Sequence, residues 1–360
     1  MPRLAIALLM VAGLWLVIEP ALAQEQSLQT DTVPDRVDDG GDNPPFTQEQ
    51  SLQTDVTPES LDTQVPSLQA PATPEYVLTI GVREWITQGR SGHNIGAVFG
   101  PPNVSSELKW RGLNVPITQL NADLLVRDRF VAEAIVGYGS RGHGTLRDED
   151  YTGDNRTQKF SDTLSQIDGG SVLTVSLTTG VRVVNWNATD NPIPGGIDLL
   201  VGYQYWSEQY EATGVQDLLA GGSRFTGVPA ITQTNTWNSI RFGTRASVPL
   251  LSRFALKGSV YYIPFTAYRN EDVHHLRTDL RKDPSFLTEA TGGSGVQLEG
   301  SVVVRVWQRL TVEAGYAYWD IRSGSGTVQA FNSNGTIGIA EHNEEHTRRQ
   351  GVFFGVNWIF

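Results

Sequence analysis

The sequence has no cysteine among its 360 residues. This absence excludes disulfide frameworks, thiolate metal sites and cysteine nucleophiles, and it leaves a chain that tolerates an oxidising compartment. Charged residues are also scarce, at 18% of the chain, and acidic residues outnumber basic ones to give a formal net charge of −12. Any catalytic chemistry must therefore come from Asp, Glu, His, Ser or Lys side chains.

Basic residues are rarest in a segment near the N-terminus. Residues 24–75 hold 11 acidic residues and a single basic one, Arg36, which gives a net charge of −10. The chain from Tyr76 onward holds 27 acidic and 25 basic residues, a net charge of −2. Neither part offers the concentrated positive charge that nucleic acid attracts, so we do not expect a nucleic-acid partner.

The first 23 residues have the pattern of a secretory signal peptide. Arg3 precedes an apolar run at residues 4–18, and Ala21-Leu22-Ala23 supplies the small residues that a signal peptidase accepts before Gln24. A signal anchor is disfavoured because the run is shorter than the roughly 20 residues that span a bilayer. We predict that residues 1–23 direct the chain across the inner membrane and are removed.

Residues 24–75 are rich in Pro, Gln, Asp and Thr and contain a direct repeat. The octapeptide QEQSLQTD at residues 24–31 returns at residues 48–55. Such a segment cannot bury enough apolar surface to offset the entropy lost on ordering, so we predict a disordered acidic linker. A flexible spacer is favoured over a partner-binding segment.

From residue 76 onward, apolar residues alternate with polar or small ones, as is typical of β-strands. In residues 310–318 one face is Leu, Val, Ala, Tyr and Tyr, and the other is Thr, Glu, Gly and Ala. The same pattern occurs at residues 120–126, 197–205, 238–248, 254–262, 296–306 and 352–360. Short connections fall near residues 127–129, 187–195, 250–253 and 307–309, and long ones near residues 88–104, 146–170, 214–234, 270–295 and 324–345. This arrangement predicts ten strands.

These connections predict an all-β fold, a ten-stranded antiparallel transmembrane β-barrel at residues 76–360 with long extracellular loops, in the outer membrane of a Gram-negative bacterium. The less apolar strand face bears ten charged residues: Arg83, Asp123, Glu133, Asp198, Arg241, Arg245, Lys257, Glu299, Arg305 and Glu313. They are too costly for the dry core of a soluble β-sandwich or lipocalin-like barrel, but they suit a hydrated, salt-bridged lumen. Their balanced signs disfavour a small porin. The terminal Phe360 resembles the C-terminal aromatic signal of such barrels.

The reactive residues gather in the predicted long loops or at their strand ends. All six histidines are there: His93, His143, His274, His275, His342 and His346. Two motifs stand out, Asp148-Glu149-Asp150 and Asp272-Val273-His274, and their loops should face each other across the barrel mouth. An Asp beside a His stabilises the imidazolium, and paired carboxylates raise one pKa and hold a proton or orient water. Together these groups can drive water onto a peptide carbonyl.

Several segments resemble the omptin family of outer-membrane proteases. They are SELKW at residues 106–110, GSRGHGTLRDEDY at residues 139–151, GYQ at residues 202–204 and NEDVHH at residues 270–275. The likeness continues in order from about Val77 to Phe360, which is the whole predicted barrel. It implies an omptin-like fold with aspartic-type endopeptidase activity.

The resemblance also implies roles for individual residues. The family's catalytic carboxylate pair falls on Asp148 and Asp150, and its catalytic couple on Asp272 and His274. A further carboxylate of the family falls on Asp162, which we take as substrate-binding. An acidic residue of the pocket for basic side chains falls on Asn270, so we expect a cationic polypeptide substrate with weakened preference for Arg or Lys.

The resemblance to the omptin family does not imply a cofactor. The two arginines with which family members hold lipopolysaccharide phosphate fall on Ser207 and Trp237, and a neighbouring Glu falls on Tyr205. We therefore expect no cofactor, with lipopolysaccharide unsupported by these positions and outer-membrane lipid as the surrounding partner. The motif HNEEH at residues 342–346 matches a zinc pattern, but no helix is predicted there to make its histidines converge, so we expect no metal.

An alternative from another class remains open. A catalytically silent barrel with the same fold would serve as an adhesin or a structural surface protein. Only the set Asp148, Asp150, Asp272 and His274 distinguishes the peptidase from this alternative.

Overall fold

The computed structural model describes residues 75–140, 142–186, 191 and 193–360. The predicted signal peptide at residues 1–23 and all of the linker at residues 24–75 except Glu75 lie outside the described residues. Among those that are described, we find no helix long and apolar enough to cross a membrane.

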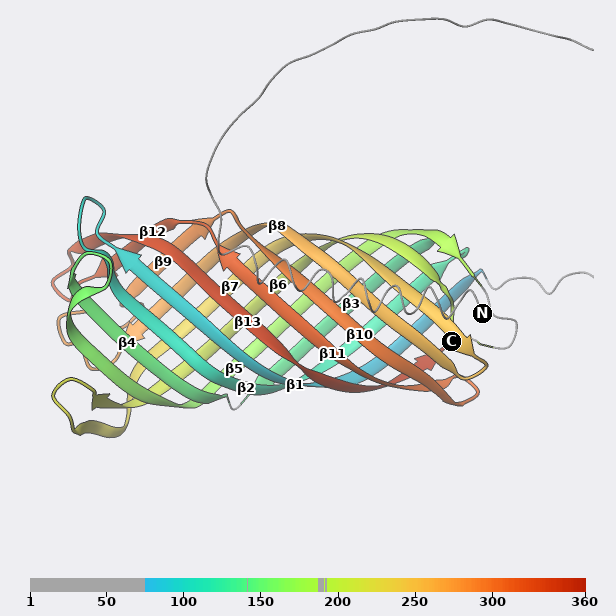
Figure 1. Cartoon of the computed structure of the whole chain (residues 1–360), viewed down its shortest axis with the longest axis horizontal. Helices are drawn as coiled ribbons and strands as arrows, with labels where there is room; N and C mark the ends of the chain where they lie inside the picture. Colours follow the sequence, from blue (N-terminus) through green and yellow to red (C-terminus); the bar gives the residue numbers. More distant parts are fainter. Residues whose placement is uncertain (1–74, 141, 187–190, 192) are drawn as a thin grey trace, which may run out of the picture. The chain divides into compact units, whose positions relative to one another are not determined.

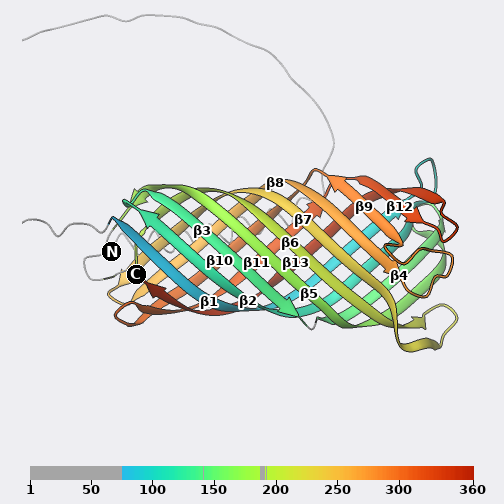
Figure 2. The ribbon, with the colours of Figure 1, turned by 180° about the vertical axis from the view of Figure 1, so that it is seen from behind.

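The described chain forms one antiparallel sheet that closes on itself (Figure 1). Its strands are β1 (Tyr76–Gly96), β2 (Asn103–Val126), β3 (Phe130–Ser140), β4 (His143–Gly153), β5 (Thr157–Asn185), β6 (Gly196–Asp217), β7 (Ser223–Leu251), β8 (Phe254–His274), β9 (Phe286–Thr291), β10 (Gly293–Trp307), β11 (Leu310–Ser323), β12 (Gly326–Phe331) and β13 (Ile337–Ile359). β1 pairs with β13 from Thr79↔Ile359 onward, so the sheet has no open edge along the barrel. The view from behind shows the same continuous wall (Figure 2).

Three of the ten barrel strands are interrupted. β3 continues into β4, β9 into β10 and β11 into β12, so the 13 labelled strands make up ten barrel strands. The break between β9 and β10 falls at Gly292 and Gly293, whose φ angles of 89° and 93° lie in the region that favours glycine. The prediction of a ten-stranded antiparallel outer-membrane barrel is confirmed.

The outer wall carries an apolar band around its middle. Exposed side chains of the band include Val82, Ile86, Leu120, Tyr138, Leu177, Phe242, Tyr262, Val302, Tyr316, Val352 and Phe354. Residues between them on each strand point into the barrel, as the period of two requires. In water this band would be a large exposed apolar surface, whereas in a bilayer it faces lipid.

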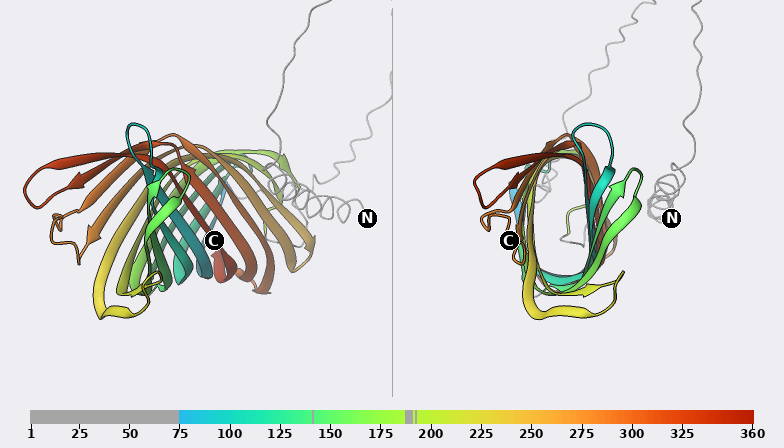
Figure 3. Two further views of the ribbon diagram at one scale, coloured as in Figure 1. Left: turned by 60° about the vertical axis from the view of Figure 1, so that its left-hand side comes forward. Right: turned by 90° about the vertical axis from the view of Figure 1, so that its left-hand side faces the viewer.

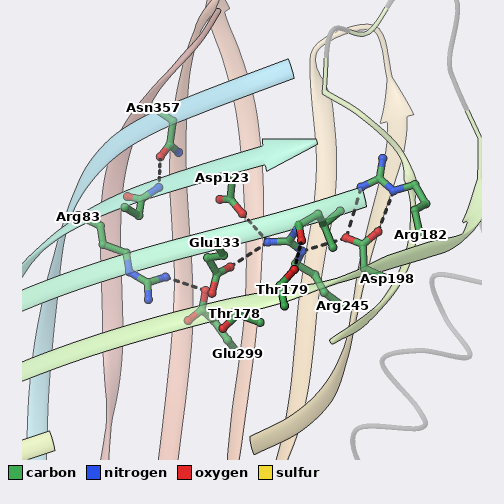
Figure 4. Close-up of polar contacts among 12 residues, drawn as sticks. Arg83, Asp123, Glu133, Thr178, Thr179, Arg182, Asp198, Arg245, Glu299 and Asn357 are labelled. Carbon is green, nitrogen blue, oxygen red and sulfur yellow. Dashed lines mark hydrogen bonds and ion pairs between the residues drawn. The ribbon is translucent and has the colours of Figure 1, made fainter. Parts of the chain in front are cut away.

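The lumen inside this band is filled by ion pairs, as the charged strand face predicts. Arg245 contacts three carboxylates, at 2.5 Å from Asp123, 2.8 Å from Glu133 and 3.1 Å from Asp198 (Figure 4). Arg83 lies 2.7 Å from Glu299. The cavity left among these residues measures about 110 Å³, room for only a few waters.

A layer of aromatic side chains also packs inside the barrel. The rings of Trp206 and Trp319 stack with centroids 4.5 Å apart, and Trp85 meets Trp206 edge-on at 6.2 Å. All three belong to a buried cluster with members on strands around the barrel. These tryptophans and the ion pairs fill the lumen, which disfavours a water-filled pore.

The predicted long loops are mostly strand, and this differs from the sequence analysis. β1 and β2 pair as far as Gly96↔Asn103, and β4 and β5 pair as far as Gly153↔Thr157. The reason is physical: beyond the lipid both strand faces are polar, so the apolar alternation fades while backbone pairing continues. The extensions form the end of the barrel that carries β4, β9 and β12 (Figure 1), and the end-on view shows an oval section (Figure 3).

Candidate active site at the extended end of the barrel

Asp148 and Asp150 point from β4 toward the inside of the barrel. In the sheet Asp148 lies opposite Leu108 of β2, and both Leu108 and Leu146 are buried on the inner face. Cross-strand neighbours share a face, so Asp148 shares the inner face with these leucines, and Asp150, two residues on, follows it.

Asp272 and His274 occupy the end of β8. Asp272 is 3% exposed, and its Oδ1 has no hydrogen-bond partner. The ring of His274 meets Phe286 edge-on, with centroids 4.9 Å apart. Ser285 fixes this segment, because its backbone N–H donates to the Asp272 carbonyl at 2.7 Å and its hydroxyl accepts from the His274 N–H at 3.0 Å.

Electrostatics link the two motifs across the lumen. Burial, then the charges of Asp150 and Asp272, raise the pKa of Asp148 to about 8. Burial raises the pKa of Asp272 to about 7, and a nearby Glu345 adds to the rise while His93 opposes it. Asp148, Asp150 and Asp272 therefore share one inward-facing neighbourhood at the extended end, and His274 follows Asp272 two residues later on β8.

His274 is held neutral. Burial, then the charges of Arg277 and Lys282, lower its pKa to about 4. The hydrogen bond to Asp279 leads in raising the pKa of Arg277, and the charges of Asp150 and Asp148 add to the rise. At neutral pH the imidazole of His274 is thus uncharged and can accept a proton, whereas the carboxyl group of Asp148 retains its proton.

Asp272 has a second histidine neighbour that the sequence analysis missed. His93 of β1 lies with its Nδ1 at 3.2 Å from Glu345 Oε2 of β13, and its ring stacks on His342 at 4.9 Å. His93 is the histidine that acts on the pKa of Asp272. Only the barrel-closing register His93↔Glu345 brings these residues together, so no local sequence signal could reveal them.

Asn270 lies next to Asp272 on the same inner face. It is fully buried, and its Nδ2 donates to Asn235 Oδ1 at 2.9 Å. The Asn270 Oδ1 and both polar side-chain atoms of Gln233 are buried without a hydrogen-bond partner. The structure therefore brings Asn270 together with the candidate catalytic residues, in a lining of neutral polar groups.

Asp162 is not brought to this site. It lies opposite Glu149 in the sheet, and alternation places Glu149 on the outer face, away from Asp148 and Asp150. Its carboxylate is 2.7 Å from Arg147 and 2.9 Å from Lys159, and the Arg147 hydrogen bond leads in lowering its pKa to about 2. Its surroundings are those of an outer-surface ion-pair cluster.

The two histidines of the HNEEH motif face opposite ways. His342 is fully buried and its Nε2 lies 2.9 Å from Ser323 Oγ, whereas His346 contacts Asp320 at 3.1 Å on the outer wall. A register shift between β1 and β13 beside Asn94 and Ile95 reverses the alternation between them. Within the described residues, no group of three or more His, Asp or Glu side chains is arranged to hold a metal ion.

The closed sheet, the apolar outer band and the filled lumen define an outer-membrane β-barrel protein. A family model described as Pom, Protochlamydia outer membrane protein, matches residues 83–357, well over half of the chain. The chain belongs to this family.

Among solved structures, the barrel is similar to outer membrane protease OmpT from Escherichia coli, with a TM-score of 0.66 and 14% identity over 81% of this chain and 99% of that one. At that identity the likeness shows the fold. A Pseudomonas aeruginosa FadL homologue gives a TM-score of only 0.25, with 12% identity over 79% of this chain and 90% of that one. No curated protein matches the sequence.

Proposed function

We propose that this protein is an outer-membrane endopeptidase whose extended end faces the cell exterior. The observation that carries the proposal is the shared inward-facing neighbourhood of Asp148 and Asp150 from β4 with Asp272 from β8, two residues before His274. The fold shared with the protease OmpT supports it. The sequence resemblance to the omptin family points the same way.

The proposed reaction is hydrolysis by an activated water. Neutral His274 takes a proton from water as the oxygen attacks the peptide carbonyl, and Asp272 stabilises the imidazolium that forms. The proton held by the Asp148 and Asp150 pair hydrogen-bonds to the carbonyl oxygen as negative charge develops there. The imidazolium then donates its proton to the departing amine, so that no covalent intermediate forms.

The proposed substrate is a polypeptide, with cationic peptides favoured in encounter. Residues 146–171 carry six acidic and three basic side chains, a net charge of −3. Such a rim attracts cations, and salt weakens the attraction. Asn270 leaves the inner lining without the extra carboxylate that would select Arg or Lys strongly.

A silent barrel acting as an adhesin or structural surface protein is the second candidate. The observation that favours it is that the Asp272 carboxyl responds electrostatically to His93 and Glu345, with no contribution from His274. In that case the buried polar cluster at the extended end would only support the strands.

The test is cleavage of a broad peptide library by the refolded chain. Wild type and His274→Ala are compared, with His275→Ala as matched control, because His275 is exposed and its ring Nε2 lies 2.8 Å from the Thr232 hydroxyl. We expect cleavage by wild type and His275→Ala but none by His274→Ala. Cleavage by none of the three proteins favours the silent barrel, and equal cleavage by all three contradicts a catalytic role for His274.

A further inference from the structure

A groove lies on the outer wall where β1, β2 and β13 leave the apolar band. Its volume is about 550 Å³, and it is lined by cationic side chains that include Arg90, Lys109, Arg111, Arg156 and Arg348. Arg90 stands directly between two of these, opposite Arg348 on one side and Arg111 on the other. Three arginines side by side repel one another, so an anion bound in the groove would be stabilised by their charge.

Among the described residues, two of the groove's cations differ from the others in having no ion-pair partner. Lys109 contacts Glu107 and Glu149, Arg156 contacts Glu107, and Arg348 contacts Asp320. Within the described residues, the side chains of Arg90 and Arg111 make no hydrogen bond or ion pair with a protein group. The positive charge of Arg90 and Arg111, which no carboxylate in the described part of the chain neutralises, is thus concentrated at the end of the groove nearest the apolar band.

This end of the groove is at the height of lipid headgroups. On β1 the last strongly exposed apolar side chain is Ile86, and Arg90 follows four residues later on the same outer face. Four residues rise about 13 Å along a strand, or about 10 Å along the membrane normal at the tilt of such barrels. Arginine side chains extend and bend toward the interface, which covers the remaining distance to the headgroup layer.

We propose that the groove binds the phosphate groups of a membrane lipid headgroup through Arg90 and Arg111. Guanidinium groups match phosphate oxygens in a bidentate geometry, and Arg348 adds charge beside them. The positions to which the omptin resemblance carries lipopolysaccharide-binding arginines cannot serve here, because Ser207 is uncharged and Trp237 is fully buried inside the barrel. The proposed site is on another part of the wall and is independent of the peptidase activity.

The groove also has open space for a ligand beside the arginines. Gly92 lies between Lys109 and His346 in the sheet, and a Cβ atom added to it would meet no atom within 4 Å. A larger side chain at this position would fill the groove while leaving every cation in place.

The experiment measures binding of lipopolysaccharide to the full refolded barrel in detergent. Dephosphorylated lipopolysaccharide, phosphatidylglycerol micelles and inorganic phosphate are the comparison probes. Arg90→Gln/Arg111→Gln removes both free cations, and Arg127→Gln/Arg269→Gln is the matched control, since its two arginines are exposed and already paired with acids. We expect the first variant to weaken lipopolysaccharide binding at least about tenfold and the control to change it less than about twofold.

Two further variants keep the proposal testable if the glutamine variant fails to fold. Arg90→Lys/Arg111→Lys should retain part of the binding, and Gly92→Ile should weaken it by occlusion with all charges intact. Phosphatidylglycerol binding with the same mutational pattern also supports a headgroup phosphate. Equal binding of dephosphorylated lipid, unchanged binding by the glutamine or Gly92→Ile variant, or binding of inorganic phosphate as tight as that of lipid would overturn the proposal.

Discussion

Replacing Asp272 by asparagine should stabilise the barrel while abolishing its activity. The buried carboxyl of Asp272 has its pKa raised from an ordinary 3.8 to about 7, chiefly by burial. Below pH 4 the carboxyl is protonated in both the folded and the unfolded chain, so the pKa difference does not change the free energy of unfolding. Between about pH 4 and pH 7 the carboxyl ionises in the unfolded chain but not in the folded one, so folding stability is lost over this range.

The size of the effect follows from the pKa difference. About three pKa units correspond to roughly 4 kcal/mol at full effect, and structural relaxation around a buried carboxylate reduces this to about 2–4 kcal/mol. The asparagine side chain of the Asp272→Asn variant is neutral at every pH and avoids this loss. The free energy of unfolding should therefore be similar for Asp272→Asn and wild type at pH 4, and higher for the variant by about 2–4 kcal/mol at pH 8.

The assay is urea unfolding of the refolded barrel, followed by the fluorescence of buried tryptophans such as Trp206 and Trp319. Peptide cleavage is measured on the same preparations. If the Asp272 carboxyl is buried for the sake of function, the Asp272→Asn variant should gain stability and lose activity. Refutation would come from a variant that is destabilised at pH 8, or from a stability difference that does not change between pH 4 and pH 8.

Three other outcomes follow from the structure. Asp148→Ala and Asp150→Ala should each reduce cleavage severely and their double variant little further, because the pair acts as one unit; additive losses in kcat/KM would contradict this. Arg245→Ala removes the cation shared by Asp123, Glu133 and Asp198 and should lower the free energy of unfolding by about 3–5 kcal/mol. The control Arg269→Ala, at an exposed arginine, should lower it by less than about 1 kcal/mol, and equal losses would contradict the prediction. Cleavage of cationic peptides should slow with added salt through kcat/KM, whereas salt-independent rates would exclude steering by the acidic rim.

The barrel could be predicted from the sequence because its lipid-facing residues impose a strict period of two. Val352, Phe354, Val356 and Trp358 alternate with residues that face the lumen, and one residue of slip would turn them all inward. The lumen charges were predictable for the same reason, since Arg83 and Arg245 occupy the opposite phase. Beyond the bilayer this constraint disappears, and the extended hairpins were therefore predicted as loops.

The candidate site was predictable only in part. The motifs containing Asp148 and His274 are local in sequence, so their residues could be named, although their position on paired strands could not. His93 and Glu345 meet only when β1 and β13 close the barrel. The sheet face on which Asp162 lies could not be predicted, because it depends on the register opposite Glu149, which the sequence alone does not specify.

The rate of peptide cleavage against pH tests the central claim most directly. If His274 is the base, Asp272 its ionised partner and the Asp148 pair the holder of the catalytic proton, the rate should rise near pH 7 as Asp272 ionises and fall near pH 8 as the pair loses its proton. A solvated histidine with the ordinary pKa of about 6.5 would instead give a single rise and no fall near pH 8. Asp148→Asn should remove the limb near pH 8 from whatever activity remains. No cleavage at any pH, or a single rise near pH 6.5 that is unchanged in Asp148→Asn, would contradict a buried catalytic site at this end of the barrel.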